Sequence, residues 1–314
     1  MPLKPQPITV MLITSPTSSS ASPIRRYLTR HCSIALLAAA FTGVSFGGEK
    51  LSLANGELLA GIAENGRLVL FSAQSPEDVV VVKIEGLQPG EQILSLDRRP
   101  ANGLIYALGS TNRIYTVNFE TGNAVAVSPS PFTPALQGTR FGFDFNPAVD
   151  RIRVVSDSGQ DLRLHPDTGQ LAGIDGTLAY AAGDSGAGTT PQVIAAAYTN
   201  NDTDPATGTQ LYDIDAARGV LVLQNPPNNG TLVTVGSLGV RILGDAGFDI
   251  AGSNGIAYAS LIPAQQHGKG DVPPGNSARS YLYTIDLATG AATLVGKIGG
   301  PKPLLSLTAL GQAN

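Results

Sequence analysis

The feature that most constrains the fold is a segment of short strands and turns that recurs along the chain. Its clearest copy runs from Phe141 to Gly169 and reads FGFDFNPAVDRIRVVSDSGQDLRLHPDTG. Phenylalanines alternate with small or polar residues at 141–146, which is the period-two pattern of a strand with one large apolar face. Two further apolar runs follow, at 151–155 and 161–164, and clusters of Ser, Asp and Gly between them are typical of tight turns. The segment is therefore predicted to be a β-meander.

Two other stretches repeat this order of strands and turns. Residues 93–122 read ILSLDRRPANGLIYALGSTNRIYTVNFETG, and residues 247–290 begin GFDIAGSNGIAYAS and end YLYTIDLATG after an insertion. Another short apolar run follows each copy, at 124–127, 170–174 and 291–295. A four-stranded unit repeated every roughly forty to fifty residues is typical of a propeller blade. We predict an all-β chain with a single β-propeller-like domain of about five four-stranded blades, with six as the alternative.

The two ends of the repeat region complement each other. Residues 57–87 supply three strands but no convincing first strand, whereas residues 303–310, PLLSLTAL, resemble the opening strand QILSL at 92–96. We therefore expect the C-terminal strand to join the first blade and close the ring, which removes an exposed sheet edge. The region 191–239 holds more strands than the template, and its innermost strand is expected from residues 178–182.

The first 47 residues differ from the rest, with four basic residues and no acidic ones. The run SIALLAAAFTGVSF at 33–46 is too short to span a bilayer but has the length of a signal-peptide hydrophobic region. We expect residues 1–47 to be a leader removed near Gly48, and residues 48–314 to form the β-propeller-like domain. The mature protein would be periplasmic or secreted, with no transmembrane anchor and no disulfide, because Cys32 is the only cysteine.

Removal of the leader makes the protein more acidic. It takes away four of the 20 basic residues and none of the 24 acidic residues, which leaves 16 against 24, a net charge of −8. An acidic surface argues against nucleic acid as a partner. The expected partner is an unidentified protein, glycan or small ligand.

Acidic and basic side chains recur near the predicted first strands. Asp97, Asp144 and Asp249 occupy matching positions in SLDRRP, GFDFNP and GFDIAG, either as structural caps or facing the mouth of a central channel. Arg151 and Arg153 are two residues apart and share one face of a strand. Such a pair can clamp a carboxylate or phosphate of a ligand. The alternative is that the two arginines form salt bridges with neighbouring aspartates and bind no ligand.

No cofactor motif is evident, and calcium is the one ion that the sequence suggests. Asn200, Asn201, Asp202 and Asp204 form an oxygen-rich loop, and calcium binds carboxylate and amide oxygens. The EF-hand spacing is not met, because Ala206 stands where a third ligand should be. A solvated turn is the alternative to a calcium site at Asn201, Asp202 and Asp204.

Several motifs in order carry a family resemblance. GFDFNPAVDRIRVVSDSGQDLRLHPDTG, LAYAAGDSGAG, AAAYTNN and QNPPNNGTLVTVGSLGV resemble the bacterial family catalogued as domain of unknown function 4394. The resemblance spans roughly residues 57–310. It implies an exported β-propeller-like domain and brings no catalytic residues.

Two functions stay open, and the sequence does not decide whether the chain is an enzyme. The first is a non-catalytic extracytoplasmic binding or scaffold module, favoured because no nucleophile with a base, cofactor motif or metal constellation is found. The alternative is an extracytoplasmic hydrolase or lyase, with or without calcium, whose site lies at the propeller axis. Its candidate residues, which would equally be the ligand-binding residues, are Asp144, Arg151, Arg153 and Asn200.

Overall fold

The computed structural model describes residues 44–46, 49–51, 56–202, 204, 206–266, 269–271 and 278–313. Apart from one 3-10 turn, η1 (Pro227–Asn229), every regular element in these ranges is a strand. Two short hairpins lie outside the main sheets: β1 (Val44–Phe46) with β2 (Glu49–Leu51), and β21 (Gln265–Gln266) with β22 (Lys269–Asp271). The predicted leader, residues 1–47, lies outside the described residues except for β1.

Five antiparallel four-stranded units make up the fold, as predicted, and we number them as blades from the N-terminus. Blade 1 is β25 (Leu304–Ala313), β3 (Gly56–Ala63), β4 (Arg67–Ser72) and β5 (Ser75–Lys83). Blade 2 is β6 (Ile93–Arg98), β7 (Ile105–Gly109), β8 (Arg113–Val117) and β9 (Ala124–Ala126). Blade 3 is β10 (Phe141–Asn146), β11 (Arg151–Ser156), β12 (Asp161–Leu164) and β13 (Leu171–Ile174).

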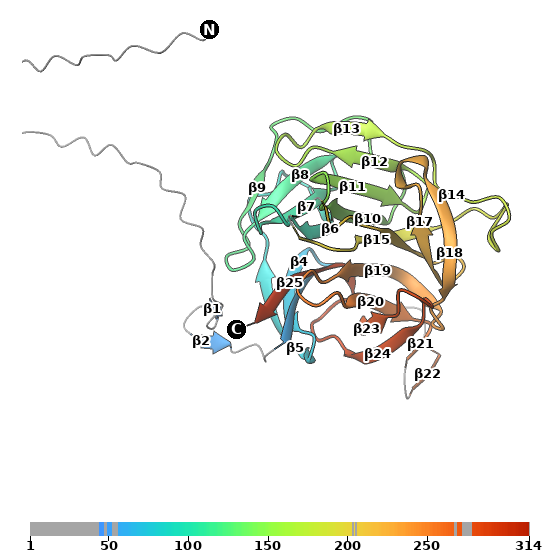
Figure 1. Ribbon diagram of the computed structural model, residues 1–314. Coiled ribbons are helices and arrows are strands. Elements are labelled where there is room, and N and C mark those ends of the chain that lie inside the picture. Colours follow the sequence, from blue (N-terminus) through green and yellow to red (C-terminus); the bar gives the residue numbers. More distant parts are fainter. Residues whose placement is uncertain are drawn as a thin grey trace, which may run out of the picture. The chain divides into compact units, whose positions relative to one another are not determined.

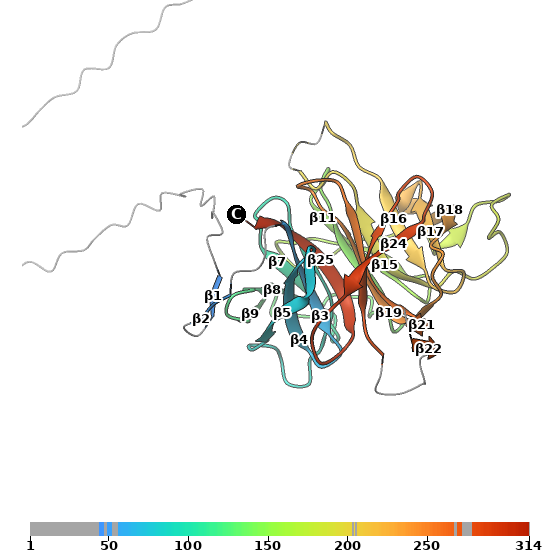
Figure 2. The same ribbon diagram turned by 90° about the horizontal axis from the view of Figure 1, so that it is seen from below.

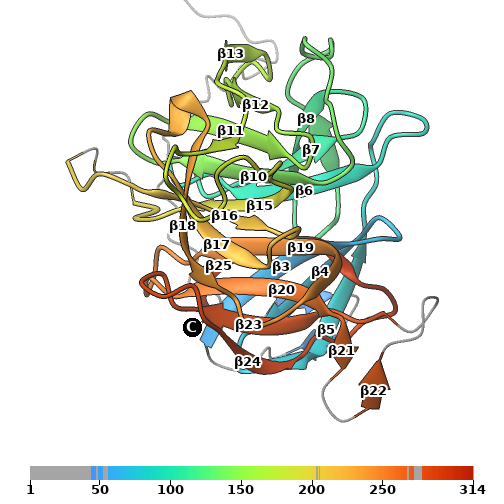
Figure 3. The same ribbon diagram turned by 90° about the vertical axis from the view of Figure 1, so that its right-hand side faces the viewer.

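Blades 4 and 5 follow the same order. Blade 4 is β15 (Val193–Tyr198), β16 (Leu211–Asp215), β17 (Val220–Gln224) and β18 (Thr231–Ser237), with β14 (Ala179–Tyr180) added at its edge. Blade 5 is β19 (Ile242–Ile250), β20 (Ala257–Pro263), β23 (Tyr281–Ile285) and β24 (Ala292–Lys297). Figure 3 shows blades 3 and 5 on opposite sides, with their first strands β10 and β19 innermost and β13 and β24 outermost.

The first strands of neighbouring blades contact one another around a closed ring, in the order β6, β10, β15, β19, β25 and back to β6. They therefore surround the propeller axis (Figure 1). Glycine permits this close approach at Gly247, where a Cβ atom would lie 2.3 Å from the backbone nitrogen of Leu307 on β25. A side chain at this position would push the two strands apart.

The ring is closed by the two ends of the propeller. β25 pairs antiparallel with β3, from Leu304 opposite Ala63 to Ala313 opposite Gly56. The last strand therefore lies beside β3, at the other end of the propeller sequence (Figure 2), which confirms the closure predicted from residues 303–310. β3 would otherwise present an unpaired edge.

The predicted first strand of blade 4 is wrong. The run at 178–182 supplies only the two-residue β14, which pairs in parallel with the outermost strand β18. The first strand is instead β15, which is buried along all six residues and pairs antiparallel with β16. The burial patterns of the two strands differ. In β14, Ala179 is exposed and Tyr180 is buried, as expected of a strand at the edge of a sheet, whereas β15 is buried on both faces.

Apolar clusters fill the spaces between neighbouring blades. Phe141, Phe143 and Phe145 of β10 pack against blade 2, where the ring of Phe145 lies 5.2 Å from that of Tyr106 in an edge-to-face arrangement. Such aromatic pairs add to the free energy gained from burial. The alternating phenylalanines that mark this segment are thus the packing surface between blades 2 and 3.

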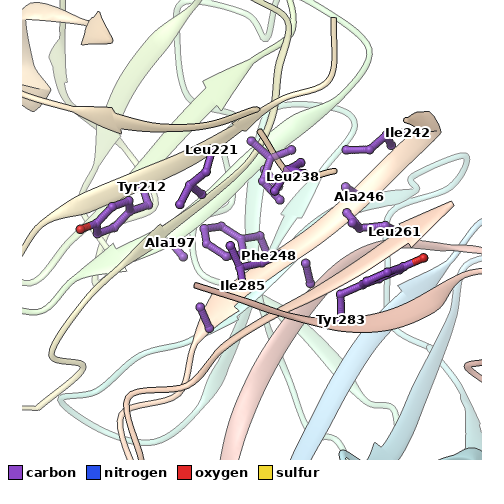
Figure 4. Packing of buried hydrophobic residues seen from close by; sticks show 14 of the residues in the cluster. Ala197, Tyr212, Leu221, Leu238, Ile242, Ala246, Phe248, Leu261, Tyr283 and Ile285 are labelled. Atoms are coloured by element: carbon purple, nitrogen blue, oxygen red, sulfur yellow. The ribbon is translucent and has the colours of Figure 1, made fainter. Parts of the chain in front are cut away.

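The largest cluster joins blades 4 and 5. Phe248 lies near its middle, with Tyr212 and Leu221 of blade 4 on one side and Leu261 and Tyr283 of blade 5 on the other (Figure 4). The sheets are therefore held to each other by apolar side chains on both faces. This leaves the inner edges of the first strands as the place where polar side chains from four of the five blades meet.

Candidate functional site

One equivalent position on the first strands forms what we call the axial ring: Asp97, Asp144, Ala197, Asp249 and Thr308. In each blade, this residue pairs directly with a residue of the second strand, so the five positions match in register. The structure thus brings together the three aspartates that the sequence placed at matching positions. One oxygen from each of these carboxylates lies within 4.8 Å of the others.

Hydrogen bonds run from blade to blade around the axial ring. Each aspartate accepts one from a backbone N–H of the next blade: Asp97 from Phe145 at 2.9 Å, Asp144 from Tyr198 at 2.9 Å, and Asp249 from Ala309 at 2.6 Å. The Thr308 hydroxyl lies 2.8 Å from Asp97 Oδ1 and 3.1 Å from Asp249 Oδ2, and it accepts a hydrogen bond from the N–H of Arg98. These bonds tie the blades together at their inner edges.

Ala197 is the one member of the axial ring without a polar group. The N–H of Ile250, which an acceptor at position 197 would face, donates instead to the carboxylate of its own neighbour Asp249 at 2.6 Å. The polar ring is therefore interrupted between blades 4 and 5. The largest apolar cluster joins these same two blades.

The carboxylates of the axial ring are removed from solvent. Asp97, Asp144 and Asp249 are at most 2% exposed. Burial raises the pKa of Asp249 to about 6, and burial together with the neighbouring aspartates raises the pKa values of Asp97 and Asp144 well above their ordinary range. A substrate cannot reach these groups without opening the ring.

Arg153 belongs to a second buried cluster, between blades 3 and 4. Its side chain is 1% exposed and donates to Asp161 at 2.6 Å, to Asp175, to the Tyr198 hydroxyl at 3.1 Å and to Asn228 at 2.8 Å. Every nitrogen of the guanidinium therefore has a partner within the protein. The side chain holds blades together and is not available to clamp a ligand.

Asp213 on β16 lies beside this cluster and is fully buried. Among the described residues, neither of its carboxylate oxygens has a hydrogen-bond partner, and the same holds for Oε1 of Gln224. Burial raises the pKa of Asp213 well above its ordinary value, and the nearby Asp161 adds to the effect. Burial thus favours the protonated form of Asp213.

Arg151 and Asn200 do not join the axial ring. Arg151 donates to the backbone carbonyls of Val149 at 3.2 Å and Asp150 at 2.8 Å. Asn200 has a positive φ of 57° and donates from its side chain to the carbonyl of Gly208 at 3.0 Å. Among the four candidates from the sequence, the structure thus places Asp144 at the axis, Arg153 between two blades, and the other two in their own turns.

In the oxygen-rich loop after β15, the aspartates bind the loop's own backbone and Asn201 binds blade 5. Asp202 accepts from the N–H of Asp204 at 2.8 Å, and Asp204 accepts from the N–H of Ala206 at 2.9 Å. Asn201 donates to the carbonyl of Ile250 at 3.0 Å. The two aspartate contacts are the Asx-type contacts of a turn, whereas the Asn201 contact joins the loop to blade 5.

Thr308 is the polar member of the axial ring that sequence reasoning missed. The sequence contains the signal, because LLSLT at 304–308 aligns with ILSLD at 93–97, and in this alignment Thr308 occupies the same position as Asp97. In the same alignment, Ser306 occupies the position of Ser95. Asp161 and Asp175 give no such signal, since their arginine partners lie on other strands, and Asp213 has no hydrogen-bond partner among the described residues.

Comparison with known proteins identifies a family without an assigned activity. A family model described as Domain of unknown function (DUF4394) matches residues 67–308. A structural genomics protein of unknown function from Bacteroides thetaiotaomicron VPI-5482 is similar, at 13% sequence identity and a TM-score of 0.47, over 84% of this chain and 67% of that one. No curated protein matches the sequence. None of the helical segments in the described part of the chain has the length and apolarity needed to cross a bilayer.

Proposed function

Because the chain belongs to the family of the domain of unknown function DUF4394, whose description assigns no activity, we propose a function from its geometry: an exported, non-catalytic propeller that binds a protein partner. The burial of the candidate catalytic groups carries this proposal. Asp144 and Arg153 are each 1% exposed, and both are hydrogen-bonded to the neighbouring blade 4. A hydrolase or lyase needs such groups within hydrogen-bond reach of its substrate. The alternative of an enzyme with an axial site is therefore not favoured.

The partner surface that we propose is the face formed by the turns between first and second strands. Three of these turns expose a large apolar side chain: Leu104 at 51%, Val149 at 56% and Ile256 at 40%. All three turns lie on one face, because the first strands run in the same direction around the axis. Exposed apolar side chains gathered on one face favour a protein partner over a glycan.

Binding is tested with the chain 48–314 on a peptide array and a glycan array, followed by affinity measurements on the hits. We expect peptide hits whose affinity falls at least about tenfold in L104S/V149S/I256S. The matched control V125S/I174S alters residues that are 55% and 65% exposed on the outermost strands, and its affinity should stay within about twofold of wild type. Turnover of an ester, glycoside or uronide substrate that D144N abolishes would overturn the proposal, as would peptide binding that the triple variant leaves unchanged.

Export is tested separately by expressing the full chain in a bacterium and measuring the mass of the extracytoplasmic product. The basic residues and apolar run of residues 1–47 support removal of this segment, so the product should begin near Gly48. Protein that remains in the cytoplasm with residues 1–47 attached would contradict export while leaving the binding proposal to its own test.

A further inference from the structure

The axial ring concentrates negative groups that no basic side chain neutralises. Within the described residues, neither Asp97 nor Asp144 nor Asp249 forms an ion pair with Lys, Arg or His, although Arg153 and Arg99 pair with other aspartates. Burying unpaired carboxylates is costly, so these groups must be neutralised by protons or by a cation.

The hydrogen bonds of the axial ring do not supply a donor to every carboxylate oxygen. Thr308 has a single hydroxyl proton, yet its oxygen lies close to the carboxylates of both Asp97 and Asp249. In the described part of the chain, Asp144 accepts one hydrogen bond, at Oδ1 from Tyr198, and none at Oδ2. The ring therefore offers more acceptor oxygens than the protein supplies donors.

A cavity next to the axial ring gives an independent sign of a missing ligand. Ser95, Gly142, Ala195, Gly247 and Ser306, each two residues before a ring member, contribute to its lining. It leaves about 10 Å³ for the centre of a water molecule, which is room for one water. The Ser306 hydroxyl is buried and has no hydrogen-bond partner among the described residues. A buried hydroxyl without a partner on a cavity wall indicates a polar ligand there.

We propose that the propeller axis binds one calcium ion through the carboxylates of Asp97, Asp144 and Asp249, with water in the adjoining cavity as a further oxygen ligand. The donor set is oxygen only, which selects a hard cation over zinc or copper. Oxygens separated by up to 4.8 Å fit opposite sides of an ion with bonds of about 2.3–2.6 Å. Ser306 and its counterpart Ser95 orient the water.

This ion is structural and is independent of the partner surface proposed above. It would join blades 2, 3 and 5 at their inner edges, where the three aspartates originate. The site also differs from the surface loop that the sequence suggested for calcium, because Asp202 and Asp204 bind their own backbone.

The test measures calcium in the chain 48–314 after dialysis against chelator and then against calcium. We expect one calcium ion per chain by elemental analysis, and a melting temperature that rises when calcium is returned to the stripped protein, since a ligand specific to the folded state stabilises it. D144N should lower the calcium affinity at least tenfold. The matched control D202N/D204N removes the surface acids and should bind calcium like wild type.

A second, milder variant tests the proposal even if D144N does not fold. S306A keeps all three carboxylates and removes only the cavity hydroxyl, and it should weaken calcium binding about tenfold, as expected for an outer-shell group. Wild-type protein that retains no calcium and whose melting temperature does not respond to it would overturn the proposal and leave protons as the neutralising species. Calcium binding that D202N/D204N abolishes would also overturn it.

Discussion

The substitution Arg153→Met isolates the energetic role of the buried cluster between blades 3 and 4. Asp175 keeps Arg163, which donates to it at 2.8 and 2.9 Å, but Asp161 keeps only Gln224 at 2.6 Å. The variant therefore leaves one uncompensated buried charge, which costs about 3–5 kcal/mol of unfolding free energy. For a domain of this size, the loss corresponds to a fall in melting temperature of about 6–20 °C.

Urea denaturation of the chain 48–314, followed by circular dichroism, measures this cost. The matched control is Arg151→Met, which removes a guanidinium of the same strand that bonds only to backbone carbonyls, and it should cost less than about 1 kcal/mol. A loss in R153M no larger than the loss in R151M would refute the claim that Arg153 is a structural ion-pair residue.

The pH dependence gives a second check on Arg153→Met. Burial raises the pKa of Asp161 to about 6 even with Arg153 present, and loss of the cation raises it further. A carboxyl group whose pKa is raised in the folded state contributes its full stability below the unfolded-state pKa of about 4. This contribution is lost as the pH rises through the folded-state pKa. The destabilisation by R153M should thus be smaller at pH 5 than at pH 8, and an equal cost at both values would contradict this account.

Three further predictions concern other buried polar groups and the ring closure. Thr308→Val keeps the side-chain shape but removes the hydroxyl between Asp97 and Asp249, so urea denaturation should show a loss of about 2–3 kcal/mol; an unchanged midpoint would contradict it. Asp213→Asn should stabilise the protein, because it replaces a buried carboxyl that has no described partner. Its advantage should be smallest below about pH 3, where Asp213 is protonated in both states, and should grow as the pH rises above about 4, by up to about 1.4 kcal/mol per unit; a flat difference across this range would show that the group does not titrate on unfolding. Deletion of residues 304–314 exposes the edge of β3, so the product should lose its cooperative unfolding transition and bind a hydrophobic dye; a cooperative, soluble product would refute the closure.

The strand order of the propeller could be predicted from local sequence because each blade repeats the same turns and apolar runs. The closure by residues 304–313 followed from a similarity between two short segments, and β25 confirms it. β15 was not recognised as a first strand, because VIAAAY lacks the alternation and the polar ring residue that mark the other first strands. Where Ala197 replaces the polar residue of the repeat, the pattern that identifies a first strand is absent.

The candidate site was only partly predictable, since its partners come from strands far apart in sequence. The matching positions of Asp97, Asp144 and Asp249 indicated a shared place in the blades, but their mutual approach depends on the ring having five blades. Arg153 was recognised, whereas its partner Asn228 lies in a turn of the next blade. Such contacts follow from the packing of whole sheets, which no local pattern encodes.

The strand β25 also determines when the fold can be completed. It pairs residues at the two ends of the propeller, so the contacts of blade 1 have the largest sequence separation in the molecule. Contacts of this kind form late and slow the folding of β proteins, because the chain between them must be ordered first. A growing chain thus keeps β3 as an open edge until residues 304–313 arrive, and this seam is where an incomplete chain is most exposed to misassembly and proteolysis.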